Sequence, residues 1–382
     1  EKSEIDKVDE ARRAGKYLVV QTAPAIRATL GEEFGYKIGT PVTGQMVAAL
    51  RRLGFNKVYD TNFGADLTIM EEANELLARI KDGGVLPMIT SCSPGWINYA
   101  EYYYGDQLDH LSSCKSPHQM QGAIIKSYFA EKNGLKPEDI FVVSIMPCTA
   151  KKFEKERPQL QKNGIKDVDA VLTTRELAKL IKRSGINFAK LPNEEFDQDL
   201  MGEYTGAGVI FGATGGVMEA ALRTAYHELT GKEYEAVEFT AVRGMQGLKE
   251  ATLNIAGSEI KVAVASGMRN AKVLMDEIRS GKSPYTFIEI MGCPGGCVNG
   301  GGQPYVKPCF LPNEDNNILD TYKEKRAQAL YSEDERQKVR QSHNNKQVQK
   351  LYSDFLEKPN SHKAHELLHT TYEARERFPE NK

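Results

Sequence analysis

Hydrophobic runs of strand length alternate with amphipathic stretches of helix length along most of the chain. Apolar residues dominate residues 16–23, 57–60 and 140–146, and each run is short and ends at a turn residue, as buried strands do. Between the first runs, residues 41–53 and 65–81 repeat apolar positions every three or four residues, which predicts helices that cover a sheet. Strands that alternate with helices in this way are typical of a parallel α/β sheet.

The same alternation continues through the second half of the chain. A hairpin is predicted from residues 252–256 and 260–266, which flank a Gly-Ser turn. The fold class predicted is therefore α/β, with mainly parallel sheet flanked by helices. Further strands are expected at residues 85–90, 168–173, 236–242 and 285–291, and further helices at residues 175–184, 217–230 and 270–279.

The composition changes after residue 312. From residue 320 to the end the chain is charged, poor in glycine and low in strand signals. This pattern predicts a helical C-terminal segment, residues 313–382, that wraps a larger unit formed by residues 1–312.

Length and charge bound the class of protein. The chain has 382 residues, 40% of them hydrophobic, which is enough for a large core in one domain or two lobes. Its formal net charge of −2 gives no indication of a nucleic-acid partner. No apolar run approaches the roughly 18 residues of a membrane helix, so no membrane partner is expected. The chain begins with Glu1, so we expect a fragment or a processed product.

Cysteines follow three of the predicted strands directly. Cys92, Cys148 and the pair Cys293 and Cys297 each lie in a loop at the end of an apolar run. The carboxyl ends of parallel strands line one crevice, so these loops could converge. Four thiols are the number that a 4Fe–4S cubane takes, and the alternative is a set of tight turns with buried free cysteines. Cys114 and Cys309 lack this placement and are expected to be small buried residues.

Three long motifs resemble the signatures of the diiron FeFe-hydrogenases. They read TSCSPGW at residues 90–96, MPCTAKKFE at residues 146–154 and EIMGCPGGCVNGGGQP at residues 289–304. The likeness extends over nearly the whole chain. It implies two lobes of mainly parallel sheet with a cluster in the cleft between them. On this resemblance residues 1–312 form the catalytic H-cluster domain, residues 313–382 resemble a small subunit, and the reaction is reversible reduction of protons to H2.

The resemblance also implies a cofactor and its ligands. The H-cluster joins a 4Fe–4S cubane, through one cysteine sulfur, to a diiron unit that carries CO, cyanide and an azadithiolate bridge. By position, Cys148, Cys293 and Cys297 would ligate the cubane and Cys297 would bridge to the diiron unit. Lys151 would donate a hydrogen bond to a cyanide. The diiron site would be lined by Pro24, Ala25, Met146, Phe211 and Met291.

Ser93 is a departure from the family pattern, which has two adjacent cysteines at this point. Cys92 occupies the position of a proton relay, and Ser93 occupies that of the fourth cubane ligand. A hydroxyl is a harder ligand than a thiol and loses its proton less readily. Three outcomes stay open: Ser93 ligates as an alkoxide, the fourth site is open or filled by water, or Cys92 shifts to ligate the cubane.

A row of charged residues supplies a candidate proton path. Glu72, Glu75 and Arg79 are spaced three and four apart, so they share one face of the predicted helix that leads to the strand before Cys92. The resemblance implies a path from Arg79 through Glu75, Ser112 and Glu72 to Cys92. A solvated stripe of ion pairs is the commoner use of such spacing and is the alternative.

Partners and location follow from the resemblance alone. It implies ferredoxin or a similar electron carrier, maturases that insert the diiron unit, and a cytoplasmic location, or a hydrogenosome or other organelle in a eukaryote. The rival hypothesis is a non-catalytic relative that holds iron–sulfur clusters for cluster assembly or H2 sensing. Lys151, Met291, Cys297 and the two glutamates favour the enzyme, whereas Ser93 favours the rival. A zinc protein is a distant third, because no cysteine–histidine pairing has finger spacing.

Overall fold

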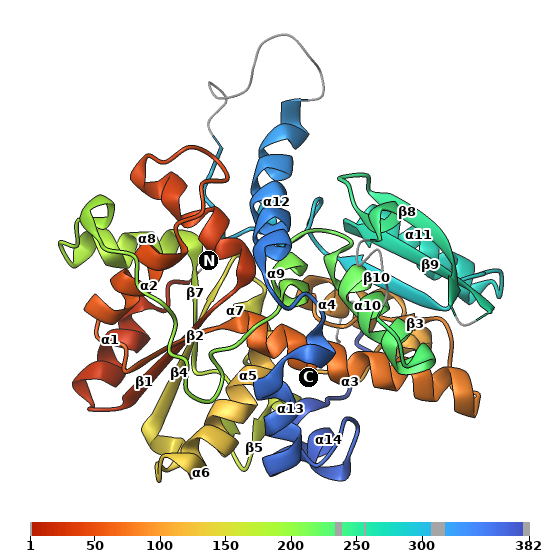
Figure 1. The fold of residues 1–382 in the computed structure, drawn as a ribbon, viewed down its shortest axis with the longest axis horizontal. Coiled ribbons are helices and arrows are strands. Elements are labelled where there is room, and N and C mark those ends of the chain that lie inside the picture. The colour runs from red at the N-terminus through yellow and green to blue at the C-terminus, as the bar shows by residue number, and fades with distance from the viewer. Residues whose placement is uncertain (1, 234–238, 256, 307–317, 377–382) are drawn as a thin grey trace.

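Two sheets with flanking helices form two lobes, and one long helix contacts both (Figure 1). The computed structural model describes residues 2–233, 239–255, 257–306 and 318–376. The α/β architecture predicted from the sequence is confirmed.

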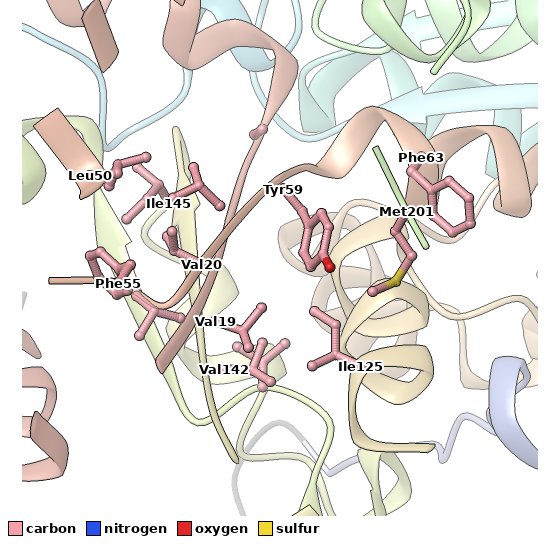
Figure 2. Close-up of a cluster of buried hydrophobic side chains, with 14 of the residues drawn as sticks. Val19, Val20, Leu50, Phe55, Tyr59, Phe63, Ile125, Val142, Ile145 and Met201 are labelled. Carbon is pink, nitrogen blue, oxygen red and sulfur yellow. The ribbon is translucent and has the colours of Figure 1, made fainter. Parts of the chain in front are cut away.

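The first lobe is built on a four-stranded parallel sheet in the order β2-β1-β4-β7. Val20 pairs with Val58 on one side and with Val143 on the other, so the central strand is apolar on both faces. Figure 2 shows its valines packed among side chains from the neighbouring strands and helices. The strands are β1 (Tyr17–Thr22), β2 (Lys57–Asp60), β4 (Ile140–Met146) and β7 (Ala170–Thr173). The lobe also holds α1 (Ile5–Arg13), α2 (Thr43–Arg52), α5 (Pro117–Ile124), α6 (Ala130–Lys132) and α8 (Thr174–Arg183).

The second lobe is built on a sheet in the order β3-β10-β9-β8, in which only β8 is antiparallel. Its strands are β3 (Met88–Ile89), β8 (Leu248–Ile255), β9 (Ser258–Ser266) and β10 (Phe287–Met291). The remaining helices of the core are α4 (Pro94–Tyr103), α7 (Lys151–Glu154), α9 (Gly206–Ile210), α10 (Gly216–Thr230) and α11 (Met268–Arg279), and β5 (Gln161–Lys162) pairs with β6 (Ile165–Lys166) in a small hairpin.

The long helix α3 (Thr61–Asp82) joins the lobes by packing on α5 in the first and on α10 in the second. It starts immediately after β2 because the Asp60 side chain accepts from the backbone N–H of Asn62 at 3.1 Å, which caps the helix. It ends at Gly83, whose φ of 73° is a left-handed conformation that glycine adopts without strain. This helix carries Glu72, Glu75 and Arg79.

The C-terminal segment lies against both lobes. It contains α12 (Ile318–Arg336), α13 (Lys346–Leu351) and α14 (His362–Leu368), in agreement with its predicted helical character. Arg326 forms an ion pair with Glu32 of the first lobe at 2.6 Å, and Asp334 pairs with Arg223 of α10 at 2.8 Å. None of the described helices has the length and apolar character needed to cross a lipid bilayer.

Three predicted strands differ from the structure. The strand expected at residues 85–90 is reduced to β3, because Val85 and Leu86 are exposed and Pro87 has no N–H to donate to a ladder. The prediction for residues 236–242 is wrong for its described part, where a 3-10 helix spans Thr240–Val242; residues 234–238 lie outside the described residues. The first arm of the hairpin starts at Leu248, four residues earlier than expected.

Candidate active site

The cysteine loops meet at one cavity between the two lobes. Its volume is about 740 Å³, which includes the space at its opening to solvent. The loops after β3, β4 and β10 place four thiols and one hydroxyl on its wall. These side chains belong to Cys92, Ser93, Cys148, Cys293 and Cys297. Cys114 is buried elsewhere, as expected of a small core residue, and Cys309 lies outside the described residues.

Glycine is required where these loops touch one another. A Cβ at Gly296 would lie 2.6 Å from the backbone nitrogen of Thr214, and its φ of 91° is left-handed. A Cβ at Gly300 would lie 2.2 Å from the carbonyl oxygen of Pro147. Both contacts are shorter than any side chain tolerates. The loop that carries Cys297 is therefore held against the loop that carries Cys148 by direct backbone packing.

The apolar side of the cavity contains most of the predicted lining. Pro24, Met146, Phe211 and Met291 line it, and so does Lys151. Ala25 is the exception: its side chain packs in a separate cluster with Val298 and Leu330, and Ala23 lines the cavity instead. The backbone enters a 3-10 helix at Pro24, which turns the next residue into the core.

Ser93 faces the cysteine pair of the third motif. Its hydroxyl accepts a hydrogen bond from the backbone N–H of Gly292 at 3.1 Å, next to Cys293. The position that the family pattern assigns to a fourth ligand is thus at the cavity and beside one of the other two cysteine loops. The hydroxyl already has one protein partner there.

The thiols are half-buried, and desolvation opposes their ionisation. Burial raises the pKa of Cys293 to about 11 and that of Cys297 to about 12, and it raises the pKa of Cys148 as well. Thiolates in such a site need a cationic partner, and soft metals are the partners that thiolates prefer. An apolar cavity with clustered thiols therefore fits a cysteine-bound iron–sulfur group better than it fits free cysteines.

The charged face of α3 is a hydrogen-bonded row that runs from the half-buried Arg79 and Glu75 to the buried Glu72. Arg79 donates to Glu75 at 2.6 Å, and Ser112 Oγ donates to the other oxygen of Glu75 at 2.9 Å. Ser112 is also a hydrogen-bonding neighbour of Glu72, which is fully buried. Burial first, and then the charge of Glu75, raises the pKa of Glu72 to about 8. Burial and the charge of Glu72 raise the pKa of Cys92 in turn.

Two residues of the site escaped the sequence analysis. His118 lines the cavity, and Glu154 lies next to it with its carboxylate on Lys151 at 2.9 Å. Glu154 is three residues after Lys151, so the spacing on a helical turn could have indicated the ion pair. His118 lies at the start of α5, far from every cysteine motif, and nothing in the sequence pattern placed it at the site.

Comparison with known proteins agrees with this geometry. The family model for the iron-only hydrogenase large subunit, C-terminal domain, matches residues 16–301, and the model for the iron hydrogenase small subunit matches residues 320–375. The chain belongs to the iron-only hydrogenase family.

Iron hydrogenase 1 of Clostridium pasteurianum is 50% identical to this hydrogenase-family chain over 373 residues, which is 97% of the chain and 64% of the relative. The chain therefore spans less than two thirds of that relative's length. A solved FeFe-hydrogenase structure, which concerns oxygen inactivation through degradation of the 2Fe subcluster of the H cluster, is 40% identical to this chain. The match covers 98% of this chain and 99% of the solved chain, with a TM-score of 0.82. The cytosolic Fe–S cluster assembly factor narfl of Xenopus tropicalis is 33% identical over 95% of the chain and 75% of its own length.

Proposed function

We propose that this chain is the catalytic part of an FeFe-hydrogenase that reduces protons to H2 reversibly. One observation carries the proposal: a cavity lined by clustered thiols and by Lys151 lies beside a hydrogen-bonded row of proton-carrying groups that leads from the half-buried Arg79 toward Cys92. A protein that only holds an iron–sulfur cluster needs the thiols but does not need a row of proton-carrying groups.

The proposed cofactor is the H-cluster, and the donor set of the cavity fits it. Cys148, Cys293 and Cys297 would hold the 4Fe–4S part, with Cys297 as the bridge and Ser93 at the fourth position. Met146, Phe211, Met291 and Pro24 would surround the diiron unit with its CO, cyanide and azadithiolate ligands. When bound, this group supplies the electrons and the metal centre at which protons become H2.

Lys151 brings positive charge to the cavity. Its ammonium donates to the Cys92 carbonyl at 2.9 Å, and its side chain is only 11% exposed. A fixed cation is worth most in a site from which water is excluded, so Lys151 is suited to hold a cyanide ligand. The apolar wall formed by Phe211 and the two methionines keeps water away from the same region.

The row on α3 is suited to deliver protons in one order. Glu75 receives hydrogen bonds from Arg79, from Ser112 and from the backbone N–H of Ser113. Glu72 keeps its proton at neutral pH because its pKa is raised to about 8. Cys92 also keeps its proton. In the proposed path a proton passes from Glu75 through Ser112 to Glu72 and then to Cys92.

The experiment is to load the full chain with its cluster and to compare wild type with Glu75→Gln. The amide cannot carry the proton, so H2 evolution from a chemical reductant falls by about 100-fold or more while iron content is unchanged. Asp82→Asn, at the exposed end of the same helix, is the matched control and evolves H2 normally. Normal evolution by Glu75→Gln would remove Glu75 from the path.

The electron partner, the assembly factors and the location belong to the proposal too. Ferredoxin or a similar carrier is the proposed donor, maturases would insert the diiron unit, and a cytoplasmic or organellar location is expected. The second candidate function is cluster assembly or H2 sensing without turnover. Ser93 and the identity to an assembly factor favour it. Loaded wild-type protein that holds a cubane but evolves no H2 would support that candidate.

A further inference from the structure

A buried hydrogen-bonded chain lies behind Lys151 at the edge of the cavity. Lys151 Nζ donates to Glu154 Oε2 at 2.9 Å, and the same carboxylate oxygen is 2.5 Å from His118 Nε2. On its other side the imidazole contacts Ser144 through Nδ1 at 3.1 Å. The chain of contacts therefore joins β4, the start of α5, α7 and, through the carbonyl of Cys92, the loop after β3.

Every member of this chain is removed from solvent. The exposed fraction is 1% for the His118 side chain and 8% for that of Glu154. Burial and the charge of Lys151 lower the pKa of His118 to about 4, so the ring is neutral at neutral pH. Burial alone would raise the pKa of Glu154, but its partners Lys151 and His118 outweigh this effect and hold the pKa at about 2. Glu154 therefore faces Lys151 as a carboxylate.

The geometry fixes how each donor is used. Because the Glu154 carboxylate can only accept, a neutral His118 ring donates to it from Nε2, and Nδ1 is then the acceptor for the Ser144 hydroxyl. Glu154 is thereby locked in one rotamer between two donors. The ammonium of Lys151 donates to the Cys92 carbonyl at 2.9 Å and to the Glu154 carboxylate, whose oxygens Oε2 and Oε1 lie 2.9 and 3.2 Å from Nζ. Lys151 and His118 both line the cavity.

We propose that His118 is the positioning residue for Lys151: by anchoring Glu154 to β4 it holds the ammonium between the Cys92 carbonyl and the cavity. Without His118 the carboxylate can rotate, and the ammonium can follow it away from both. The inference rests on the proposed function only for the identity of the ligand that Lys151 contacts in the cavity. The hydrogen-bonded chain consists of the protein's own residues and does not depend on that function. His118 and Lys151 are also the two side chains with nitrogen atoms among the described residues that line the cavity.

The test combines a mutant cycle with a spectroscopic readout. In the full chain before cluster insertion, urea unfolding is measured for wild type, His118→Leu, Lys151→Met and the double variant. The unfolding equilibrium constant of the double variant is expected to differ by at least about threefold from the product of the single effects. Additive effects would show that His118 does not act on Lys151 and would overturn the proposal.

The second readout is the cyanide stretching frequency of the loaded protein, which a packing role of His118 would not move. His118→Leu should shift the cyanide bands in the direction in which Lys151→Met shifts them. His118→Gln keeps a donor for Glu154 and should restore the wild-type position. Wild-type bands in His118→Leu, with shifted bands in Lys151→Met, would contradict the proposal. If wild type shows no bands at all, the proposed function fails, and the mutant cycle alone decides whether His118 holds Lys151.

Discussion

At the scale of single residues, Ser93 would decide how the proposed cubane is held. Its hydroxyl is at the cavity but already accepts from Gly292, and a hydroxyl binds iron less readily than a thiol does. Ser93→Cys should slow the loss of cluster iron to a chelator about threefold or more. Ser91→Cys is the control, because the Ser91 hydroxyl points to the Cys114 carbonyl at 2.7 Å and does not line the cavity. Equal iron loss from wild type and Ser93→Cys would show that position 93 does not reach the cluster.

Glu72 gives the second prediction at this scale, a pH dependence. Its folded pKa of about 8 is above the unfolded value of 4.5, so the native state binds the extra proton between these two values. The resulting stabilisation is complete below pH 4.5 and is lost as pH rises through about 8. Glu72→Gln removes this dependence. Relative to wild type, the variant should therefore gain about 2–3 kcal/mol of unfolding free energy between pH 6 and pH 9.

Urea unfolding of both proteins at the two pH values measures this difference, and a constant difference would show that Glu72 titrates in the native state as it does in water. The same residue links stability to function. The burial that destabilises its carboxylate also keeps it protonated, as a proton donor must be at neutral pH.

Some residues of the site could be predicted from the sequence and others could not. The cysteines were predictable because a strand that ends directly in a cysteine loop places that loop at one edge of the sheet. Ala25 was placed at the site by the family resemblance, which gives the position of a residue and not the direction of its side chain; here that side chain packs with Val298 and Leu330 outside the cavity lining. His118 was missed because it reaches the cavity from a helix whose own sequence has no cysteine and no acidic partner nearby.

At the scale of elements, the packing of helix α3 on α5 depends on the close approach of their backbones at Gly64. A Cβ at Gly64 would lie 2.4 Å from the carbonyl oxygen of Pro117, at the start of α5, so Gly64→Ala must push the two helices apart. We expect it to destabilise the protein by about 1–3 kcal/mol in urea unfolding. It should also reduce H2 evolution, because α3 carries the glutamates and α5 carries His118.

Gly95→Ala in α4 is the control for that prediction, since a Cβ there meets nothing within 4 Å. It should be neutral or slightly stabilising, because alanine favours a helix over glycine. Equal destabilisation by the two substitutions would show that the α3–α5 contact is not the cause of the lost stability. The helices were predictable from their apolar spacing, whereas this contact was not, since Gly64 and Pro117 belong to distant parts of the chain.

At the scale of the whole molecule, the C-terminal segment ties the lobes around the cavity. Arg326 also donates to the carbonyl of Val298, the residue after Cys297, so this segment supports the loop of the third motif. The division into a catalytic unit at residues 1–312 and a segment at residues 313–382 stays a prediction. Its helical character followed from composition, but its contacts with both lobes required the structure.

The central claim is that this cavity holds a diiron unit with CO and cyanide ligands joined to a cubane. Infrared spectroscopy of the full chain after maturation tests it most directly. We predict bands in the CO and cyanide stretching region, together with H2 evolution. A protein that carries a cubane signal and shows no such bands would contradict the account.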